Sequence, residues 1–361
     1  MIREEHLPQK NLRNILIFGG KGDFSGVPAY IKKIKRLGVI DAFEAVIIIG
    51  SDYGGYDEIE DQKTIIRSFQ GLERGAPLSL IRAFQYAKRT NADVVLANGF
   101  IGILLARVLC LIKRKTVKLY VIHHGLPFDP GATMLQRAIG LIFEKFFLYL
   151  GIKQTIISIS IDNKLRLTRI YKNSIAAKVV YLPNSIDMDE RDDLKMDFST
   201  LDSYRGVWIG RDAKQKDPEL LAKIASKLPY NYTIDVYGKF TPKRITYLKR
   251  LSANKLNFKG HGPLDLEYVF KNVKFFIQTS KYEGFSIAML EAAKYRLPIF
   301  VSNVSGVADL QRSYSGIEVF SDCYDAASKL AQHDFDKQHG WLDYALSDRV
   351  WSSTLQKLIS Q

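Results

Sequence analysis

Short apolar runs rich in β-branched residues alternate with helix-length segments along almost the whole chain. Strands are predicted in the first half at residues 15–18, 45–49, 93–97, 118–122, 155–159 and 179–182, and in the second half at 207–209, 233–237, 256–259, 275–278, 299–302 and 317–320. Nearly continuous apolar strands separated by helices are typical of a parallel sheet covered on both faces. Two such sets predict an α/β protein with two doubly wound, Rossmann-like parallel-sheet domains.

The length of 361 residues suits two domains. The pattern breaks after the segment from Pro183 to Asp187, where an acidic stretch (189–197) follows. We therefore expect one domain at 1–187, a second at 188–345, and a final segment at 346–361 whose amphipathic helix (350–359) returns towards the first domain. Ligands of open parallel sheets bind beyond the carboxyl ends of the strands, so the two domains are expected to face each other across a cleft.

Composition limits the class of protein. The two cysteines, Cys110 and Cys323, are far apart and have no metal-like spacing, which favours a reducing compartment. Residues 1–14 are charged and have no apolar core of signal-peptide length, so no signal peptide is expected, and no run reaches the roughly 20 apolar residues of a spanning helix. The net charge is +14, and residues 101–182 carry thirteen Lys or Arg against three acidic residues. Such a basic field attracts anionic ligands, lipid surfaces or nucleic acid, but no aromatic-rich nucleic-acid motif accompanies it, so we expect no nucleic-acid partner.

The stretch from Thr279 to Ala293 carries the strongest chemical signal. A predicted strand runs into a short polar loop that opens directly onto a helix, so free backbone N–H groups and the positive end of the helix dipole face an anion. Glu283 lies in the loop, and Glu291 lies about a turn and a half inside the helix. Two acceptors beside an anion site suit a ligand with phosphate and hydroxyl groups, such as a sugar nucleotide. The alternative is a pair of carboxylates that only face water.

Three other loops of the second half also follow predicted strands. The first runs from Gly210-Arg211 to Lys216, and its two cations can neutralise a diphosphate without a metal. Gly238 ends the next strand and lets a ligand approach the backbone. A glycine-bracketed loop at 258–263 follows the strand after that. Each loop is also compatible with an ordinary surface turn.

The first half has weaker signals. A glycine-rich loop at 19–28 precedes a helix that begins near Val27, but its glycine spacing is one residue off the dinucleotide fingerprint. The pair His123-His124 ends a strand, where a histidine can hydrogen-bond a substrate hydroxyl or stabilise developing charge; a buried histidine bonded to backbone is the alternative. The acid pairs at 187–189 and 334–336 are interpreted as surface residues, and no required metal is predicted.

Together these motifs resemble those of the retaining GT-B glycosyltransferases of family 4, of the bacterial surface-polysaccharide type. The family's Gly-Arg-x-x-x-x-Lys and Glu-Gly-Phe-x-x-x-x-x-Glu segments are matched in order, as are its Pro-Asn-x-x-Asp link, its His-Gly and its glycine loop; the matching residues begin at Gly210, Glu283, Pro183, His124 and Ser25. The chain departs from the family at Arg296, where a glycine is usual, and at residues 305–309, where Gly-Gly-x-x-Glu is replaced.

The resemblance implies a role for each matching residue. Domain 188–345 would bind the nucleotide sugar and domain 1–187 would lie on the acceptor side. Arg211 and Lys216 would contact the donor diphosphate, and Glu291 would hold the ribose. Catalysis would involve His124 and Glu283. Further contacts are expected from Ser25 and Gly26 of the N-terminal glycine loop and from the donor-binding residues Gly238, Gly284, Phe285 and Ser286.

The implied activity is that of a metal-independent hexosyltransferase without a cofactor, which moves a sugar from a nucleotide-sugar donor to a glycan acceptor with retention of configuration. A markedly apolar helix at 134–151 follows the basic residues Lys113, Arg114, Lys115 and Lys118, which suits an anionic membrane face and a lipid-linked acceptor in polysaccharide synthesis. A helix buried in the first domain is the alternative. A cytoplasmic protein peripheral to the inner face of the membrane is expected.

Two other functions stay open from the sequence. A nucleotide-sugar epimerase would have the same two domains without an acceptor. A non-enzymatic carbohydrate- or anion-binding protein would have neither donor turnover nor product. The identity of the base, sugar and acceptor does not follow from the residues.

Overall fold

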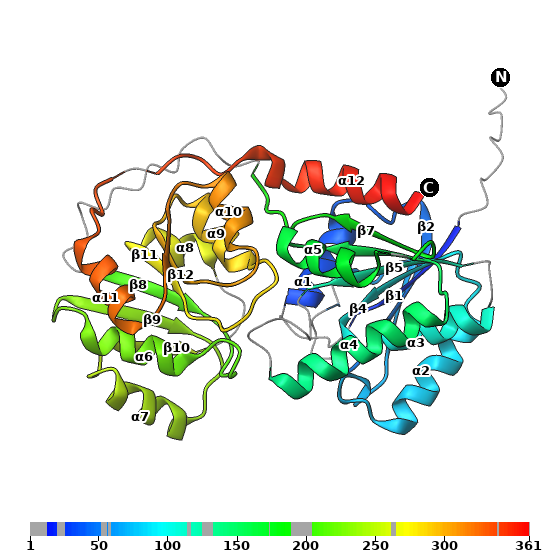
Figure 1. The fold of residues 1–361 in the computed structure, drawn as a ribbon, viewed down its shortest axis with the longest axis horizontal. Helices are drawn as coiled ribbons and strands as arrows, with labels where there is room; N and C mark the ends of the chain where they lie inside the picture. The colour runs from blue at the N-terminus through cyan, green and yellow to red at the C-terminus, as the bar shows by residue number, and fades with distance from the viewer. Residues whose placement is uncertain are drawn as a thin grey trace, which may run out of the picture. The chain divides into compact units, whose positions relative to one another are not determined.

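A computed structural model describes residues 13–19, 26–51, 56, 59–113, 117–124, 133–172, 174–188, 204–260, 265–337 and 339–360. Within these residues the chain forms two parallel sheets, each with helices on both faces (Figure 1). This arrangement confirms the predicted α/β fold of two doubly wound, Rossmann-like domains. The acidic stretch 189–197 lies outside the described residues.

The first sheet has seven strands in the order β3-β2-β1-β4-β5-β6-β7. Their bounds are β1 Arg13–Phe18, β2 Phe43–Ile49, β3 Thr64–Ser68, β4 Val94–Asn98, β5 Lys118–His123, β6 Gln154–Ser158 and β7 Ala177–Tyr181. Six of the seven match the predicted strands to within two residues at each end. The edge strand β3 is the one that the sequence analysis missed, because most of its side chains are exposed and its sequence has no continuous apolar run.

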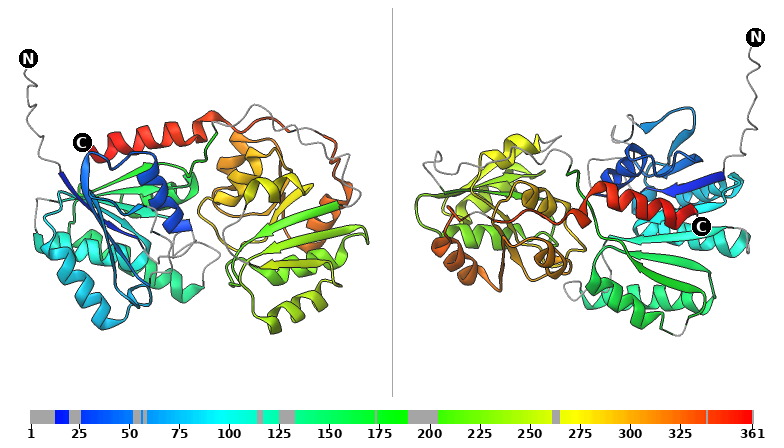
Figure 2. Two further views of the ribbon diagram at one scale, coloured as in Figure 1. Left: turned by 180° about the vertical axis from the view of Figure 1, so that it is seen from behind. Right: turned by 90° about the horizontal axis from the view of Figure 1, so that it is seen from above.

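Helices α1 Gly26–Arg36, α2 Pro77–Arg89, α3 Gly99–Lys113, α4 Met134–Tyr149 and α5 Ile161–Ile170 connect these strands. Strand order reverses at β1, so right-handed crossovers place α1 on one face of the sheet and the later helices on the other (Figure 2). The predicted helix near Val27 and the predicted apolar helix at 134–151 are both present. A capping box between Thr133 and Gln136 begins α4.

The second sheet has six strands in the order β10-β9-β8-β11-β12-β13. Strand and helix bounds are β8 Tyr204–Ile209, α6 Pro218–Lys227, β9 Tyr232–Tyr237, α7 Pro242–Leu251, β10 Leu256–Gly260, α8 Leu266–Lys271, β11 Phe275–Gln278, α9 Ile287–Lys294, β12 Ile299–Ser302, α10 Val307–Ser313, β13 Ile317–Phe320 and α11 Cys323–Gln332. All six strands were predicted. Helices α6, α7 and α11 share one apolar core with the sheet, and α8, α9 and α10 lie on the opposite face (Figure 1).

The last helix, α12 Asp348–Ser360, confirms the helix predicted at 350–359. The Tyr120 hydroxyl donates to the Leu358 carbonyl at 2.7 Å, and Arg13 Nη1 donates to the Ser360 carbonyl at 3.1 Å. These bonds attach the end of α12 to β5 and β1 of the first sheet. None of the helices that the structure describes is both long and apolar enough to cross a membrane.

Candidate nucleotide-sugar site

Two loops that follow strands of the second sheet pack directly against each other. The backbone N–H of Lys281 donates to the Gln215 carbonyl at 2.7 Å, and the Gln215 side-chain amide donates to the Tyr282 carbonyl at 3.1 Å. The buried Thr279 hydroxyl donates to the Lys216 carbonyl at 2.8 Å. The carboxyl ends of β8 and β11 are neighbours in the sheet, and these bonds therefore hold the loops 210–217 and 279–286 as one surface.

The surface carries an ion pair between Lys216 and Glu283. Lys216 Nζ donates to Glu283 Oε2, and both side chains are only about one-sixth exposed, at 17% and 16%. The Ser280 hydroxyl lies 3.4 Å from the same carboxylate oxygen. The structure thus joins two residues that the sequence analysis placed in separate motifs 67 positions apart.

Arg211 stands at the start of the same loop and is exposed. In the part of the chain that the structure describes, its guanidinium has no carboxylate partner, whereas the neighbouring Asp212 accepts from Arg244 at 3.0 Å. The structure therefore brings Lys216 and Glu283 into contact but does not join the Arg211 side chain to them. Arg211 is thus a solvent-exposed cation on the loop that also carries Lys216.

Helix α9 begins at this surface. Its N-cap is Ser286, and no described side chain accepts a hydrogen bond there, in contrast to α6, where Asp217 accepts from the Leu220 N–H at 3.3 Å. The first amides of a helix need an acceptor from outside the helix. With the partial positive charge of the helix end, the start of α9 is suited to an anion. Glu291 lies on α9 and is half-buried.

The glycines of this surface are required by close contacts between backbone segments. A Cβ at Gly284 would lie 1.9 Å from the His124 carbonyl oxygen, and a Cβ at Gly238 would lie 1.9 Å from the Gly210 carbonyl oxygen. Gly306 has a φ of +83°, and its Cβ would lie 2.3 Å from the Gly284 oxygen. Any side chain at these positions collides with backbone, which explains why glycine occurs there.

His124 follows β5 and is half-buried, with its carbonyl against Gly284. Burial, and to a lesser extent the neighbouring His123, lowers the pKa of His124 to about 4. A neutral imidazole at neutral pH can both donate and accept a hydrogen bond. These contacts, like those of the two loops, lie within one compact unit of the protein, made of residues 123–151 and 156–354.

Several contacting residues were not predicted as site residues. Asn184 Nδ2 donates to the Phe285 carbonyl at 2.6 Å, and Asp309 accepts from the Ile161 N–H at 3.0 Å and from the Tyr181 hydroxyl at 3.2 Å. Asn184 belongs to the Pro-Asn-x-x-Asp segment and Asp309 to the segment that departs from the family, so both were visible as motif positions. Their role in holding the loop and helix starts in place required the fold.

Other predicted features are not described by the structure. Ser25, Gly125, Arg114, Lys115 and the loop residues after Gly260 up to position 264 lie outside the described residues. Gly26 is the first residue of α1. Among the described residues, no group of three or more His, Cys, Asp or Glu side chains is arranged to hold a metal ion.

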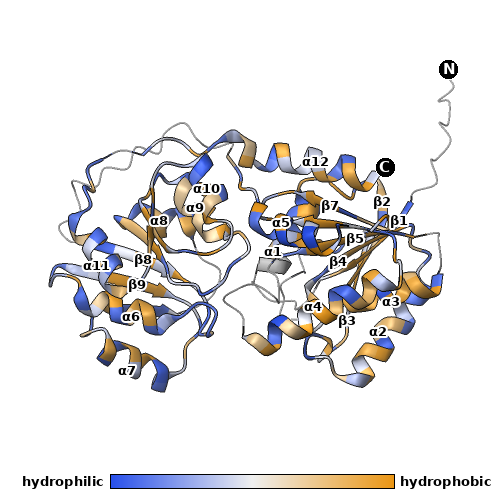
Figure 3. Ribbon diagram, viewed as in Figure 1, coloured by the Kyte–Doolittle hydropathy of each residue, from blue (hydrophilic) through white to orange (hydrophobic). Residues whose placement is uncertain are grey.

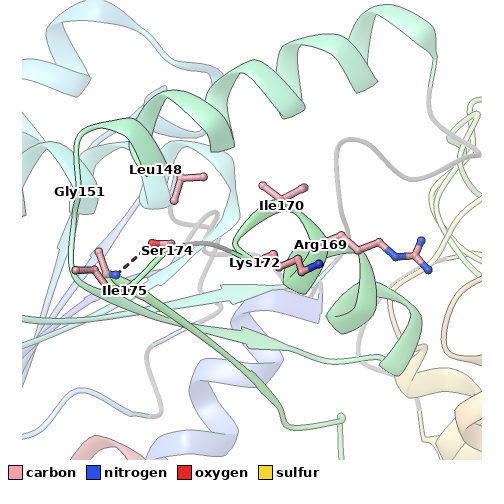
Figure 4. Close-up of a pocket in the computed structure, with 8 residues that line it drawn as sticks. Leu148, Gly151, Arg169, Ile170, Lys172, Ser174 and Ile175 are labelled. Atoms are coloured by element: carbon pink, nitrogen blue, oxygen red, sulfur yellow. Dashed lines mark hydrogen bonds between the residues drawn. The ribbon is translucent and has the colours of Figure 1, made fainter.

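A cavity of about 440 Å³ lies elsewhere, at the ends of α4 and α5. Its lining combines apolar side chains such as Leu148 and Ile170 with the cations Arg169 and Lys172 (Figure 4). The Ser174 hydroxyl there accepts from the Ala176 N–H at 3.2 Å. None of the predicted donor residues lines this cavity, so it is not the nucleotide site.

Comparisons with known proteins give a family match for part of the chain and a similar fold for nearly all of it. Residues 200–332 match the family model of the group 1 glycosyl transferases. Over 107 residues the chain is 30% identical to the O-antigen biosynthesis glycosyltransferase WbnH of Escherichia coli, a match that covers 30% of this chain and 31% of that protein. The chain thus spans about a third of the length of this relative.

Solved structures extend the similarity to the whole fold. The structure of Anabaena Alr3699/HepE in complex with UDP and glucose superposes with a TM-score of 0.71 at 16% identity, over 96% of this chain and 98% of the other. The sucrose-phosphate synthase from Thermosynechococcus elongatus gives a TM-score of 0.69 at 16% identity, over 96% and 92% of the two chains. The chain has the GT-B fold. With the family match, this supports a GT-B glycosyltransferase of the polysaccharide type, as the motifs indicated.

Proposed function

We propose that this GT-B protein is a retaining, metal-independent hexosyltransferase that moves a sugar from a nucleotide-sugar donor to a glycan acceptor in cell-surface polysaccharide synthesis. The observation that carries the proposal is the Lys216–Glu283 pair at the start of α9, on the surface formed by two strand-end loops. The group 1 family match over residues 200–332 supports the same activity.

The donor diphosphate binds between the cations and the first amides of α9. Lys216 and Arg211 neutralise it, and the helix end adds partial positive charge, so departure of the nucleoside diphosphate needs neither a metal nor a cofactor. Glu291 holds the ribose. Because Gly238 has no side chain, the backbone of the loop that begins at Gly210 can pack directly against it.

The transferred sugar binds next to residues 283–286. Glu283 accepts from sugar hydroxyls, and the backbone around Phe285 and Ser286 contacts the distal phosphate. His124, neutral at neutral pH, hydrogen-bonds the sugar from the other side of Gly284. Attack from the face that the leaving group vacates gives retention of configuration without an enzyme nucleophile. Ser25 and Gly26 of the N-terminal glycine loop enter the proposal from the family resemblance alone.

The acceptor is proposed to be lipid-linked, because α4 is rich in hydrophobic residues (Figure 3) and several of their side chains are exposed. Five of its exposed large side chains fall on a single helical stripe: Leu135, Ile139, Ile142, Phe146 and Tyr149, which are 50–88% exposed. The cations Arg169, in the last turn of α5, and Lys172, two residues after α5, line the cavity of Figure 4 together with Leu148 of α4. An apolar stripe beside cations suits the surface of an anionic bilayer, and we place the protein at the inner face of the membrane, in the cytoplasm.

Direct assays distinguish this proposal from the alternatives. A panel of nucleotide sugars and nucleoside diphosphates is tested for thermal stabilisation, and a ligand at 100 times its Kd should add about 2.7 kcal/mol. Transfer of sugar to an acceptor identifies the transferase, whereas a changed free sugar nucleotide identifies an epimerase. Absence of any stabilisation by nucleoside diphosphates would leave a non-enzymatic binding protein.

The Lys216→Ala variant tests the site itself. Loss of one electrostatic partner of a transition state costs about 2.7–4 kcal/mol, so turnover should fall by about 100- to 1000-fold while the protein stays folded. Lys271→Ala is the matched control, because Lys271 forms an exposed pair with Glu267 on α8. Equal turnover in the two variants would refute the assignment of Lys216, and Arg211→Ala is assayed in the same way.

A further inference from the structure

A buried polar cluster lies under the end of β5 and has no role in the donor site described above. It consists of His123, Glu144 and Tyr171, whose side chains are 5%, 1% and 4% exposed. The Tyr171 hydroxyl donates to Glu144 Oε2, and His123 Nε2 lies 3.7 Å from Glu144 Oε1. The three side chains come from β5, from α4 and from the residue that ends α5.

The buried carboxylate of Glu144 constrains the arrangement of the cluster. A carboxylate removed from water is strongly unfavourable unless hydrogen-bond donors or an opposite charge compensate it. One oxygen of Glu144 accepts from the Tyr171 hydroxyl and the other lies 3.7 Å from His123 Nε2, so the carboxylate is held between these two side chains. Leu141 and Leu148, one turn before and after Glu144 on α4, pack into the small core that contains Tyr171. Helix α4 is therefore held in register with the end of β5.

The end of β5 is also where the first part of the chain contacts the donor loop. His123 is the last residue of the strand, and His124 follows it with its carbonyl against Gly284. Gly284 has no side chain that could adapt, and the contact is backbone to backbone. A displacement of His123 is therefore passed both to the His124 imidazole and to the loop that begins α9.

We propose that Glu144 and Tyr171 are positioning residues for sugar transfer, which act through His123 to fix His124 and its contact with Gly284. This inference rests on the proposed function, because it assigns His124 to the sugar side of the site. The inference also assigns a role to each face of α4. Its outer face is exposed and apolar, and its inner face positions His123 and His124.

The test compares variants of the cluster with a matched tyrosine elsewhere. Tyr171→Phe and Glu144→Ala should lower kcat by about 10- to 100-fold, because displacement of reacting groups by about 1 Å has that effect. The Kd for the nucleoside diphosphate should stay within about threefold, since the residues that bind it are unchanged. Glu144→Gln keeps the shape and can still accept from Tyr171, so it should recover part of the lost kcat.

Tyr314→Phe is the control. Tyr314 is also a buried tyrosine whose hydroxyl donates one hydrogen bond, to the Leu297 carbonyl at 2.8 Å. It should lower the melting temperature as Tyr171→Phe does but leave kcat at the wild-type value. Wild-type kcat in Tyr171→Phe and Glu144→Ala, or an equal loss of kcat in Tyr314→Phe, would overturn the inference.

The variant His124→Ala separates this inference from the proposed function. If His124→Ala has wild-type turnover, the assignment of His124 to the sugar fails, and the positioning role fails with it. If His124→Ala is impaired while the Glu144 and Tyr171 variants are not, His124 keeps its proposed role and only the positioning role is wrong.

Discussion

Helices α4 and α9 differ in how they use their surfaces. Helix α9 buries Met289, Leu290, Ala292 and Ala293, and its start is held by backbone contacts at Gly284 and Gly306. Helix α4 buries little besides Gly140, Glu144 and Phe147 and exposes a stripe of large apolar side chains. A helix start that is fixed by backbone contacts can position an anion accurately. An exposed apolar stripe is suited to contact with an extended surface such as a membrane. We propose that α9 places the donor anion and that α4 provides the contact with a membrane surface.

The largest effect is expected from Gly284→Ala, which tests whether the start of α9 must keep its exact position. The added Cβ would lie 1.9 Å from the His124 oxygen, so the loop or the histidine segment must move by more than about 1 Å and kcat should fall at least about 100-fold. Gly340→Ala is the control, because its Cβ would meet only the Ser315 hydroxyl at 3.7 Å. Near wild-type kcat in Gly284→Ala would show that α9 tolerates displacement at its start.

Acid should destabilise the unit that contains α9. Burial lowers the pKa of His339 from 6.5 to about 4 and also lowers the pKa of His333. Between these values His339 binds a proton in the unfolded chain but not in the folded protein. Its contribution to the free energy of unfolding is therefore fully present above about pH 6.5 and is lost as the pH falls towards 4, a loss of about 3 kcal/mol at most. Trp208, Trp341 and Trp351 report unfolding of this unit by fluorescence. His339→Gln should flatten the dependence on pH; an unchanged slope would contradict the assignment.

A double substitution tests the exposed apolar stripe of α4 as the proposed membrane contact. Ile142→Glu with Phe146→Glu replaces two side chains that are 67% and 55% exposed, each of which contributes about 1.5–3 kcal/mol when buried in an apolar phase. Binding to anionic vesicles should weaken at least about tenfold in a flotation assay. Turnover on a soluble acceptor should not change.

The control for α4 places the same charges on an exposed surface of the other sheet. Tyr230 and Tyr268 are 94% and 66% exposed, and the Tyr230→Glu, Tyr268→Glu protein should bind vesicles as the wild type does. If both double variants lose binding equally, net charge explains the result and the stripe does not.

The smallest effect is expected from Arg244→Ala. Arg244 pairs with Asp212 at 3.0 Å and with Glu219, next to Arg211, but all three side chains are at least one-quarter exposed. Exposed pairs contribute about 1 kcal/mol or less, so the melting temperature should fall by only a few degrees. A large loss of turnover would instead show that the Arg244–Asp212 pair orients Arg211. Accurate placement of the donor would then depend on residues outside α9 as well.

The sequence by itself determined the strands other than β3, the fold class and the order of the motifs. Apolar β-branched runs such as 275–278 are buried on both sides and therefore have a periodicity that can be recognised without a structure. The loop around Glu283 and the loop around Lys216 were recognised for the same reason, since each follows such a strand. The edge strand β3 was missed because an exposed edge has no such pattern.

Only the tertiary structure decided which of these residues touch. The Lys216–Glu283 pair, the backbone contact between His124 and Gly284 and the cluster of Glu144, His123 and Tyr171 each join positions 21 to 160 residues apart. Local sequence specifies turns and periodicity, but a contact between distant residues depends on strand order and on which face each helix covers. The exposure of α4 has the same origin, because its apolar composition alone fits a buried helix as well as a membrane-facing one.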